Sequence, residues 1–279
     1  MPLKLMYITN KPEIATIAQS VGVDRIFVDL EYIGKAERQY GLDTVISHHT
    51  IEDVAALRSV VTTAELMVRV NPIHDATAEY CSSREEIDRV IAAGADSVML
   101  PYFKSAEEAE FFLHCVNGRV KPILLLETPE AVADLDRILA IPGVEDIHIG
   151  LNDLSIGMGR RFLFELLADG TVESICHRIQ ETEISYGFGG IASIGKGLVP
   201  GEHILMEHYR LGSSAAILSR CFCDVTNLQN LNEAELIFAQ GVKKIRAYEA
   251  YCMEHPELWE ENRRKTAELI EQTVAQLKR

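Results

Sequence analysis

Strand-like and helix-like segments alternate along the whole chain, and this alternation limits the possible folds more than any other feature. The segments between the strands have the spacing of amphipathic helices. Eight strands that alternate with helices predict a parallel sheet closed into a (β/α)8 TIM barrel of the α/β class. The predicted strands are residues 3–8, 25–31, 65–71, 97–102, 122–128, 145–151, 186–192 and 215–220.

An open, doubly wound sheet is the alternative architecture, but it usually has fewer strands and a glycine-rich turn after the first one. The corresponding segment, YITNKPE, contains no glycine. We therefore expect one barrel domain over residues 1–250 and an additional C-terminal helical segment over residues 251–279. This extension is amphipathic and contains the only tryptophan, Trp259. It can pack on its own barrel or on a neighbouring subunit, and we favour the neighbouring subunit.

The balance of charge limits the possible partners. The 279 residues include 27 Lys and Arg against 42 Asp and Glu, which gives a formal net charge of −15. Such a chain disfavours nucleic acid and anionic membranes as partners, because both require a basic face. The N-terminus does not have the pattern of a signal peptide, and no apolar run is long enough to cross a bilayer. With six scattered cysteines, which we interpret as reduced thiols, the sequence predicts a cytoplasmic protein.

Two carboxylates lie at or just past the ends of neighbouring predicted strands. Glu127 ends the very apolar run ILLL, where an unpaired charge would cost several kcal/mol to bury. Asp153 follows the next strand, and neighbouring strands lie about 4.8 Å apart. Two carboxylates that can share one ion, with room for water, suit Mg²⁺ or Mn²⁺. A divalent cation would therefore explain a charge at the end of this strand.

Polar side chains also lie at the ends of the second and third predicted strands. Asp29 and Glu31 share the parity of Phe27, and Arg69 lies on the polar side of its own strand. Because side chains alternate across a strand, these groups are expected to point into the barrel mouth, where barrel enzymes place their chemistry. Around Asp153, the stretch GLNDLSIGMG indicates a glycine-rich loop whose N–H groups can hold a carboxylate.

At LLETPEAV and IHIGLNDLSIGMG the chain resembles the HpcH/HpaI aldolase and citrate lyase β-subunit family, and VDLE, VRVN and GADSVMLP support the match over roughly residues 3–220. The resemblance implies a metal-dependent barrel enzyme that makes or breaks a carbon–carbon bond next to a 2-oxo acid or acyl-thioester enolate. It implies that Glu127 and Asp153 bind Mg²⁺ or Mn²⁺ and that Arg69 contacts the carbonyl or enolate oxygen. The substrate-binding residues that it implies are Glu31, Arg69, Asn152, Asp153, Leu154 and Ser155.

The acid/base residue departs from the family pattern. Family aldolases have histidine and citrate lyase-like members have aspartate where this chain has Tyr32, and a tyrosine with a pKa of about 10 is a poor base near neutrality. His48 and His49, in the nearby SHHT, can supply a proton relay through water or can be solvated surface residues. Lys35 and Arg38 resemble basic residues that help citrate lyase-like members to bind an acyl substrate.

Three functions follow as hypotheses. The first is a divalent-metal-dependent carbon–carbon lyase, of the aldolase type, that acts on a small 2-oxo acid through an enolate. The second is a citrate lyase-like lyase of acyl-CoA or another acyl thioester. The third is a non-catalytic barrel that binds a metal and a carboxylate ligand. Each implies a small-molecule carboxylate as partner, and the family together with the C-terminal segment predicts a homo-oligomer, either a trimer or a hexamer.

Overall fold

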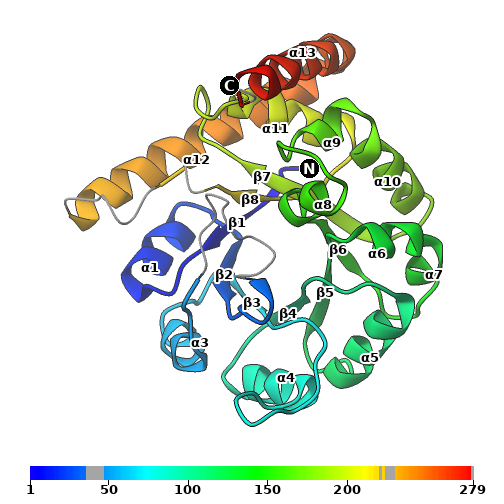
Figure 1. Ribbon diagram of the computed structural model, residues 1–279. Helices are drawn as coiled ribbons and strands as arrows, with labels where there is room; N and C mark the ends of the chain where they lie inside the picture. Colours follow the sequence, from blue (N-terminus) through cyan, green and yellow to red (C-terminus); the bar gives the residue numbers. More distant parts are fainter. Residues whose placement is uncertain (36–46, 220–221, 224–229, 278–279) are drawn as a thin grey trace.

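The computed structural model describes residues 1–35, 47–219, 222–223 and 230–277, and its central element is a closed barrel (Figure 1). Eight parallel strands pair in sequence order, and the last pairs with the first. The prediction of a (β/α)8 barrel is confirmed. The strands are β1 (Lys4–Ile8), β2 (Arg25–Asp29), β3 (Glu65–Arg69), β4 (Ser97–Leu100), β5 (Lys121–Leu126), β6 (Asp146–Ile149), β7 (Ser185–Ile191) and β8 (Ala215–Leu218).

Helices surround the barrel, and several of them begin at a residue that caps the helix. Thr50, Ser82, Ser105 and Thr128 each accept a hydrogen bond from the backbone N–H three residues later, which satisfies a donor of the first turn. The helices are α1 (Pro12–Ser20), α3 (Ile51–Arg58), α4 (Ser83–Ala92), α5 (Ala106–Val116), α6 (Pro129–Ala133), α7 (Leu135–Leu139), α8 (Leu151–Gly157), α9 (Glu165–Ala168), α10 (Thr171–Gln180), α11 (Gly201–Arg210), α12 (Leu231–Glu254), the 3₁₀-helix η1 (Pro256–Leu258) and α13 (Trp259–Leu277).

Alternation along the strands separates two apolar layers. Outward-facing residues such as Val28 and Val68 pack against the helices in the large core, and Phe27 and Met67 lie in a smaller cluster inside the barrel. The expected parity of β2 and β3 is confirmed. The other buried members of the interior cluster are Met6, Met99, Ile123, Leu125 and Ala215.

A buried ion network closes the amino-terminal end of the barrel. The guanidinium of Arg25, which is 1% exposed, donates to Asp146 at 2.8 Å and to Glu65 at 3.0 Å. Lys121 donates to the same carboxylate of Asp146 at 2.8 Å. Because all four residues lie at the starts of their strands, this network is remote from the barrel mouth and serves the fold.

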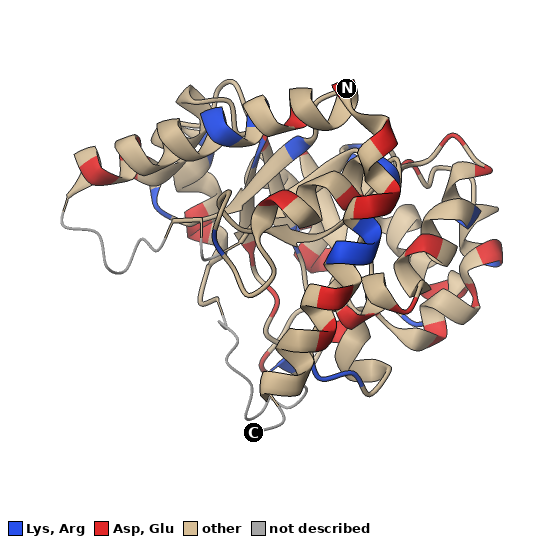
Figure 2. Ribbon diagram, turned by 90° about the horizontal axis from the view of Figure 1, so that it is seen from above, with Lys and Arg blue, Asp and Glu red and all other residues tan. Residues whose placement is uncertain are grey.

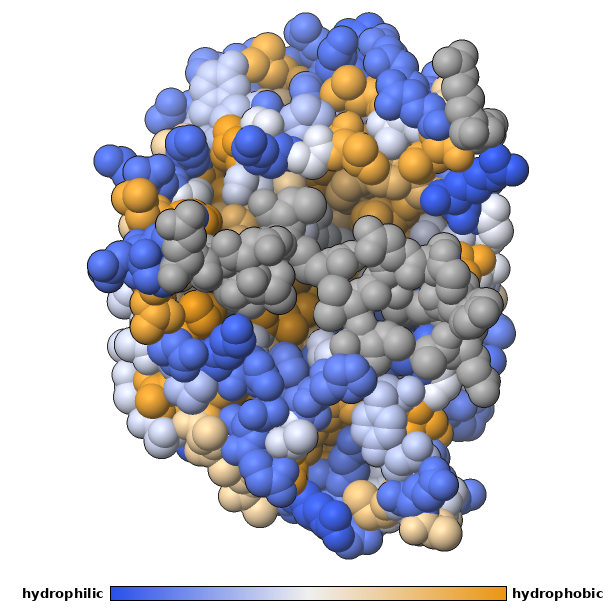
Figure 3. Space-filling model, turned by 60° about the vertical axis from the view of Figure 1, so that its left-hand side comes forward, coloured by the Kyte–Doolittle hydropathy of each residue, from blue (hydrophilic) through white to orange (hydrophobic). Residues whose placement is uncertain are grey.

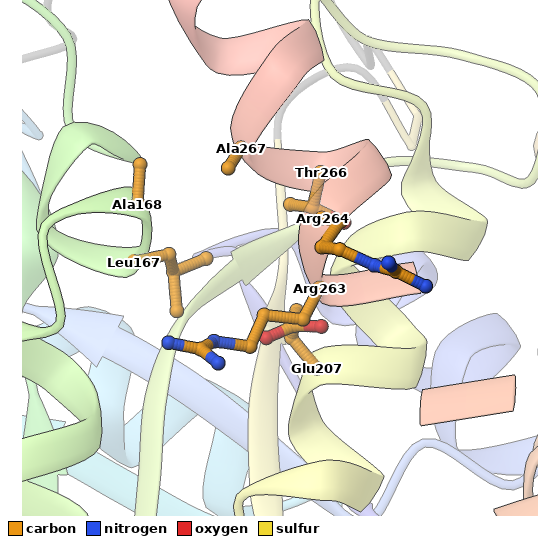
Figure 4. A pocket seen from close by; sticks show the side chains of 7 residues that line it. All are labelled: Leu167, Ala168, Glu207, Arg263, Arg264, Thr266 and Ala267. Carbon is orange, nitrogen blue, oxygen red and sulfur yellow. The ribbon is translucent and has the colours of Figure 1, made fainter. Parts of the chain in front are cut away.

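The C-terminal helix α13 packs on the barrel of its own chain, along α9 and α11 (Figure 1). Asn262 donates to Glu207 at 2.9 Å, and its side-chain oxygen lies 2.7 Å from Nδ1 of His203. A cavity of about 210 Å³ remains between the three helices, where Arg263 and Arg264 point in different directions (Figure 4). The expected boundary after residue 250 falls within α12, and contact of α13 with a neighbouring subunit stays a prediction.

The surface is rich in acidic residues. Figure 2 shows Asp and Glu on many of the outer helices, in line with the negative net charge. On the side turned forward in Figure 3, apolar residues lie between hydrophilic ones. In the part of the chain that the structure describes, no helix combines the length and the apolar character that a membrane span requires. The exposed large apolar side chains of α12 are Leu231, Leu236, Tyr251 and Met253.

Candidate active site

Two carboxylates and two cations meet where β2 and β3 end. Arg69 makes a bidentate pair with Asp29, with Nε–Oδ1 and Nη2–Oδ2 distances of 2.8 and 2.7 Å. The ammonium of Lys35 lies 3.0 Å from Asp29 and 3.1 Å from Glu31. Glu31 lies 3.4 Å from Nε of Arg69. The four side chains therefore form one network, and bidentate pairing orients the guanidinium more strictly than a single contact would.

The network keeps Asp29 and Arg69 charged at neutral pH. Burial by itself would raise the pKa of Asp29, but the cations of Arg69 and Lys35 lower that pKa well below its ordinary value. Burial would lower the pKa of Arg69, and the carboxylates of Asp29 and Glu31 raise it instead. The side chain of Arg69 is 13% exposed and lies over the ring of Phe27. A fixed cation with partial access to the mouth is suited to contact a substrate oxygen.

Glu127 lies at the end of β5, beside the start of α8. It is 3% exposed, and its Oε1 accepts a hydrogen bond from the backbone N–H of Tyr102 at 3.0 Å. The neighbouring strand leads into Gly150, where a Cβ atom would lie 2.6 Å from Oε2 of Glu127. Glycine is therefore required at this position to leave room for the carboxylate. Asp153, which is 7% exposed, follows in the first turn of α8.

The donor set fits a hard divalent cation. Among the described residues, no three or more His, Cys, Asp or Glu side chains gather as a metal site. Mg²⁺ commonly binds through one or two carboxylates, with water and substrate oxygens as further ligands, so two carboxylates are sufficient. Lys35 and Arg69 balance the charges of Asp29 and Glu31. Glu127 and Asp153 are both buried, and their carboxylate oxygens are of the kind that a divalent cation binds.

Tyr32 and His48, two of the residues considered for acid/base chemistry, lie toward solvent. The Tyr32 side chain is 45% exposed and packs against Tyr80, with ring centroids 5.3 Å apart. Burial and the neighbouring Tyr80 raise the pKa of its phenol above the ordinary value, which makes it a weaker acid than a free tyrosine. His48 is exposed. The geometry therefore favours neither side chain as a base.

His49 lies closer to the ion network. Its Nδ1 accepts a hydrogen bond from the backbone N–H of Asp29 at 3.0 Å, and the side chain is partly buried. Burial lowers the pKa of His49 below its ordinary value. Arg38, the other basic residue suggested by the resemblance, lies outside the described residues, as part of the segment 36–46.

The stretch after β6 differs from the prediction of a glycine-rich loop, because residues 151–157 form helix α8. Asn152 is exposed, Leu154 packs in the large core, and the buried hydroxyl of Ser155 donates to the carbonyl of Asn152 at 2.7 Å. A Cβ atom at Gly157 would lie 2.7 Å from the ring of Pro129. The glycine thus allows close packing of α8 on α6, which is a reason for glycine that the sequence pattern does not reveal.

Asn71 and Tyr102 also position parts of the site. The sequence places Asn71 on the polar side of its strand with Arg69, but it indicates the hydrogen-bonding role of neither residue. The side-chain oxygen of Asn71 accepts the N–H groups of Tyr32 and Ile33 at 3.0 Å each, and its amide donates to Glu86 at 2.7 Å. It therefore fixes the start of the loop after β2. Tyr102 has a φ of +49°, which is rare outside glycine. Neither role has a local signal, since each depends on which segments the barrel brings together.

The fold is shared with solved structures of low sequence identity. An HpcH/HpaI aldolase from Desulfitobacterium hafniense DCB-2 is 17% identical, with a TM-score of 0.60 over 88% of this chain and 93% of the other. An HpcH/HpaI aldolase/citrate lyase family protein from Burkholderia cenocepacia J2315 is 16% identical, with a TM-score of 0.62 over 88% and 95%. Citrate synthase SbnG is 15% identical, with a TM-score of 0.57 over 78% and 86%. A comparison with curated protein sequences gave no match.

The sequence itself decides the family. A model of the HpcH/HpaI aldolase/citrate lyase family matches residues 4–162, more than half of the chain. The chain belongs to this family. Members of the HpcH/HpaI aldolase/citrate lyase family are lyases, which supports an enzymatic role for this barrel. The match spans β1 to β6, and so it includes Arg69, Glu127 and Asp153.

Proposed function

We propose that this protein is a divalent-metal-dependent carbon–carbon lyase that acts on a small 2-oxo acid through an enolate, with Mg²⁺ or Mn²⁺ as cofactor. The observation that carries the proposal is a pair of buried carboxylates, Glu127 after β5 and Asp153 in the helix after the neighbouring strand β6, in a barrel that also presents Arg69. A 2-oxo acid offers the adjacent carbonyl and carboxylate oxygens that such a site can hold.

Each part of the site has a distinct task in this proposal. Glu127 and Asp153 would hold the cation, and polarisation of the substrate carbonyl is the chemistry that a divalent cation supplies when bound. Arg69 presents N–H donors to the oxygen that gains negative charge as the enolate forms. Asp29 and Glu31 keep the guanidinium oriented, so that the arginine does not have to reorganise during the reaction.

Proton exchange at the methyl group of pyruvate tests enolate formation without knowledge of the second product. With Mg²⁺ or Mn²⁺ present, the protein is expected to accelerate deuterium incorporation from D₂O into pyruvate. The double variant Glu127→Gln, Asp153→Asn should lose this activity, and Glu235→Gln, at an exposed position of α12, should retain it. Unchanged exchange in the double variant would contradict the proposal. Tight binding of pyruvate without exchange would favour the non-catalytic barrel.

The environment of Lys35 favours a free 2-oxo acid over an acyl-CoA. Lys35 is 3% exposed and is paired with Asp29 and Glu31, so it is not a surface cation available to the phosphates of CoA. Thermal unfolding with each class of ligand distinguishes the two substrates, because a ligand that binds only the folded protein raises the Tm. A larger increase with acetyl-CoA than with pyruvate would favour the acyl-thioester lyase.

The quaternary structure is part of the same proposal. We propose a homo-oligomer, a trimer or a hexamer, because α12 exposes large apolar side chains near both of its ends, Leu231 and Leu236 near the start and Tyr251 and Met253 near the end. Light scattering after size-exclusion chromatography measures the mass of the assembly directly. The mass of a single chain, 31.1 kDa, would contradict this part of the proposal.

A further inference from the structure

The backbone N–H of Asp29 lies on the edge of β2 that faces β1. The next N–H of the strand, that of Leu30, donates to the carbonyl of Arg69 in β3, and successive N–H groups point to opposite edges of a strand. On the β1 side, Thr9 donates to the carbonyl of Phe27, and β1 itself ends at Ile8. The N–H of Asp29 is satisfied by Nδ1 of His49 at 3.0 Å instead of by a strand carbonyl. This contact fixes the imidazole at the rim of the barrel mouth.

The contact also determines which ring nitrogen carries the proton. A backbone N–H can only donate, so Nδ1 of His49 must present its lone pair, and the neutral ring then carries its proton on Nε2. Four charged groups surround the ring: Asp29 in β2, Asp53 in α3, Lys35 after β2 and Arg69 in β3. Burial is the largest influence and lowers the pKa of His49, which favours the neutral ring at pH 7.

We propose that His49 is a neutral hydrogen-bond donor of the active site, which directs its Nε2–H to a partly negative oxygen of the bound carbonyl substrate. The identity of that substrate rests on the proposed function. His49 does not serve as a general base in this arrangement, because one ring nitrogen is occupied by the Asp29 amide and the other already holds a proton. A neutral donor of this kind polarises a carbonyl without adding charge to the site.

Nitrogen NMR tests the protonation of the ring without any turnover. In the full-length protein labelled with ¹⁵N-histidine at pH 7, His49 should show an unprotonated Nδ1 and a protonated Nε2, assigned by loss of its signals in His49→Gln. Addition of Mg²⁺ and oxalate, a mimic of the pyruvate enolate, should shift the Nε2–H signal. A doubly protonated ring, a proton on Nδ1, or an Nε2 signal that is unaffected by oxalate would each overturn the proposal.

Two substitutions distinguish the proposed role of Nε2 as a donor to the substrate from the structural role of Nδ1 as acceptor of the Asp29 N–H. His49→Asn retains an oxygen that can accept the Asp29 N–H but has no donor at the position of Nε2, whereas His49→Gln retains a donor at that distance. We expect kcat/KM for deuterium exchange into pyruvate to fall about 100-fold in His49→Asn. In His49→Gln it should stay within about tenfold of wild type. His114→Gln, at an exposed position of α5, is the control for the substitution itself. Thermal unfolding of each variant identifies any that fails to fold.

Equal losses in the two variants, or a greater loss in His49→Gln, would show a structural anchor and overturn the donor role. If the wild-type protein turns over no 2-oxo acid, the proposed function fails, while the nitrogen spectrum and its response to oxalate still decide the role of His49.

Discussion

The backbone nitrogen of Tyr102 lies 3.0 Å from Oε1 of Glu127, and Tyr102 adopts a left-handed conformation, with φ at +49°, at that position. A non-glycine residue in this region carries backbone strain, and such strain gathers at functional sites. The strain here is associated with a donor that orients the carboxylate proposed to bind the metal. The residue after β4 therefore contributes to the site through its main chain.

Substitutions at Tyr102 test this contribution. Asparagine tolerates the left-handed region, whereas a β-branched valine does not, so Tyr102→Val should be less stable than Tyr102→Asn by roughly 1–2 kcal/mol. Urea unfolding measures this difference, and calorimetric titration with Mn²⁺ should show weaker binding in the valine variant. Equal stability of the two variants would show that the backbone conformation at this position is not constrained.

Gly150→Ala should weaken metal binding by displacing Glu127. The added Cβ would lie 2.6 Å from Oε2 and 2.8 Å from Cβ of Glu127, so the carboxylate must move. We expect the affinity for Mn²⁺, measured by calorimetry, to fall at least about tenfold, as when groups that orient metal ligands are lost. Gly143→Ala is the control, because Gly143 has a φ of +94° and no neighbour within 4 Å of the added atom. It should lose stability and keep the affinity; an unchanged affinity in Gly150→Ala would argue against Glu127 as a ligand.

Asp146→Asn should destabilise the barrel without affecting the mouth. The substitution leaves Arg25, at 1% exposure, without its closer carboxylate partner, and the loss of one member of a buried pair costs about 3–5 kcal/mol. Glu85→Gln, which breaks an exposed pair with Arg89, should change the free energy of unfolding by less than about 1 kcal/mol. Urea unfolding compares the two variants. Oxalate binding by folded Asp146→Asn should match wild type, and its loss would mean that the two ends of the barrel are coupled.

The buried histidine His148 should make the protein less stable as the pH falls from about 6.5 to about 4. Burial lowers its pKa from 6.5 to about 4, so in this range the unfolded chain binds a proton that the folded protein does not. Stability is then lost at up to about 1.4 kcal/mol per pH unit from this residue. His148→Gln should reduce the slope of unfolding free energy against pH between pH 5 and 6 by about that amount. His114→Gln, at an exposed position in α5, is the control for the substitution itself. A slope in His148→Gln equal to that of the wild type would contradict a lowered pKa of His148 in the folded protein.

The alternation of strands and helices and the direction of the polar side chains were predictable because both depend on local periodicity. The period of two along β2 and β3 places Asp29 and Arg69 on the inner side, and the closed barrel then brings them to within 2.7 Å of each other. In the same way, Glu127 continues the inward parity of Ile123 and Leu125. A pattern of this kind is visible in one strand alone, without knowledge of the segments that the strand contacts in the fold.

The choice among Tyr32, His48 and His49 was not predictable, because it depends on where β1 ends relative to β2. Only the folded barrel leaves the Asp29 N–H open to Nδ1 of His49, while Tyr32 packs against Tyr80 and His48 faces solvent. The helical conformation of residues 151–157, the backbone donor of Tyr102 and the packing of α13 likewise arise from contacts between distant segments. Periodicity describes one strand or helix at a time, and such contacts exist only after the chain has closed the barrel.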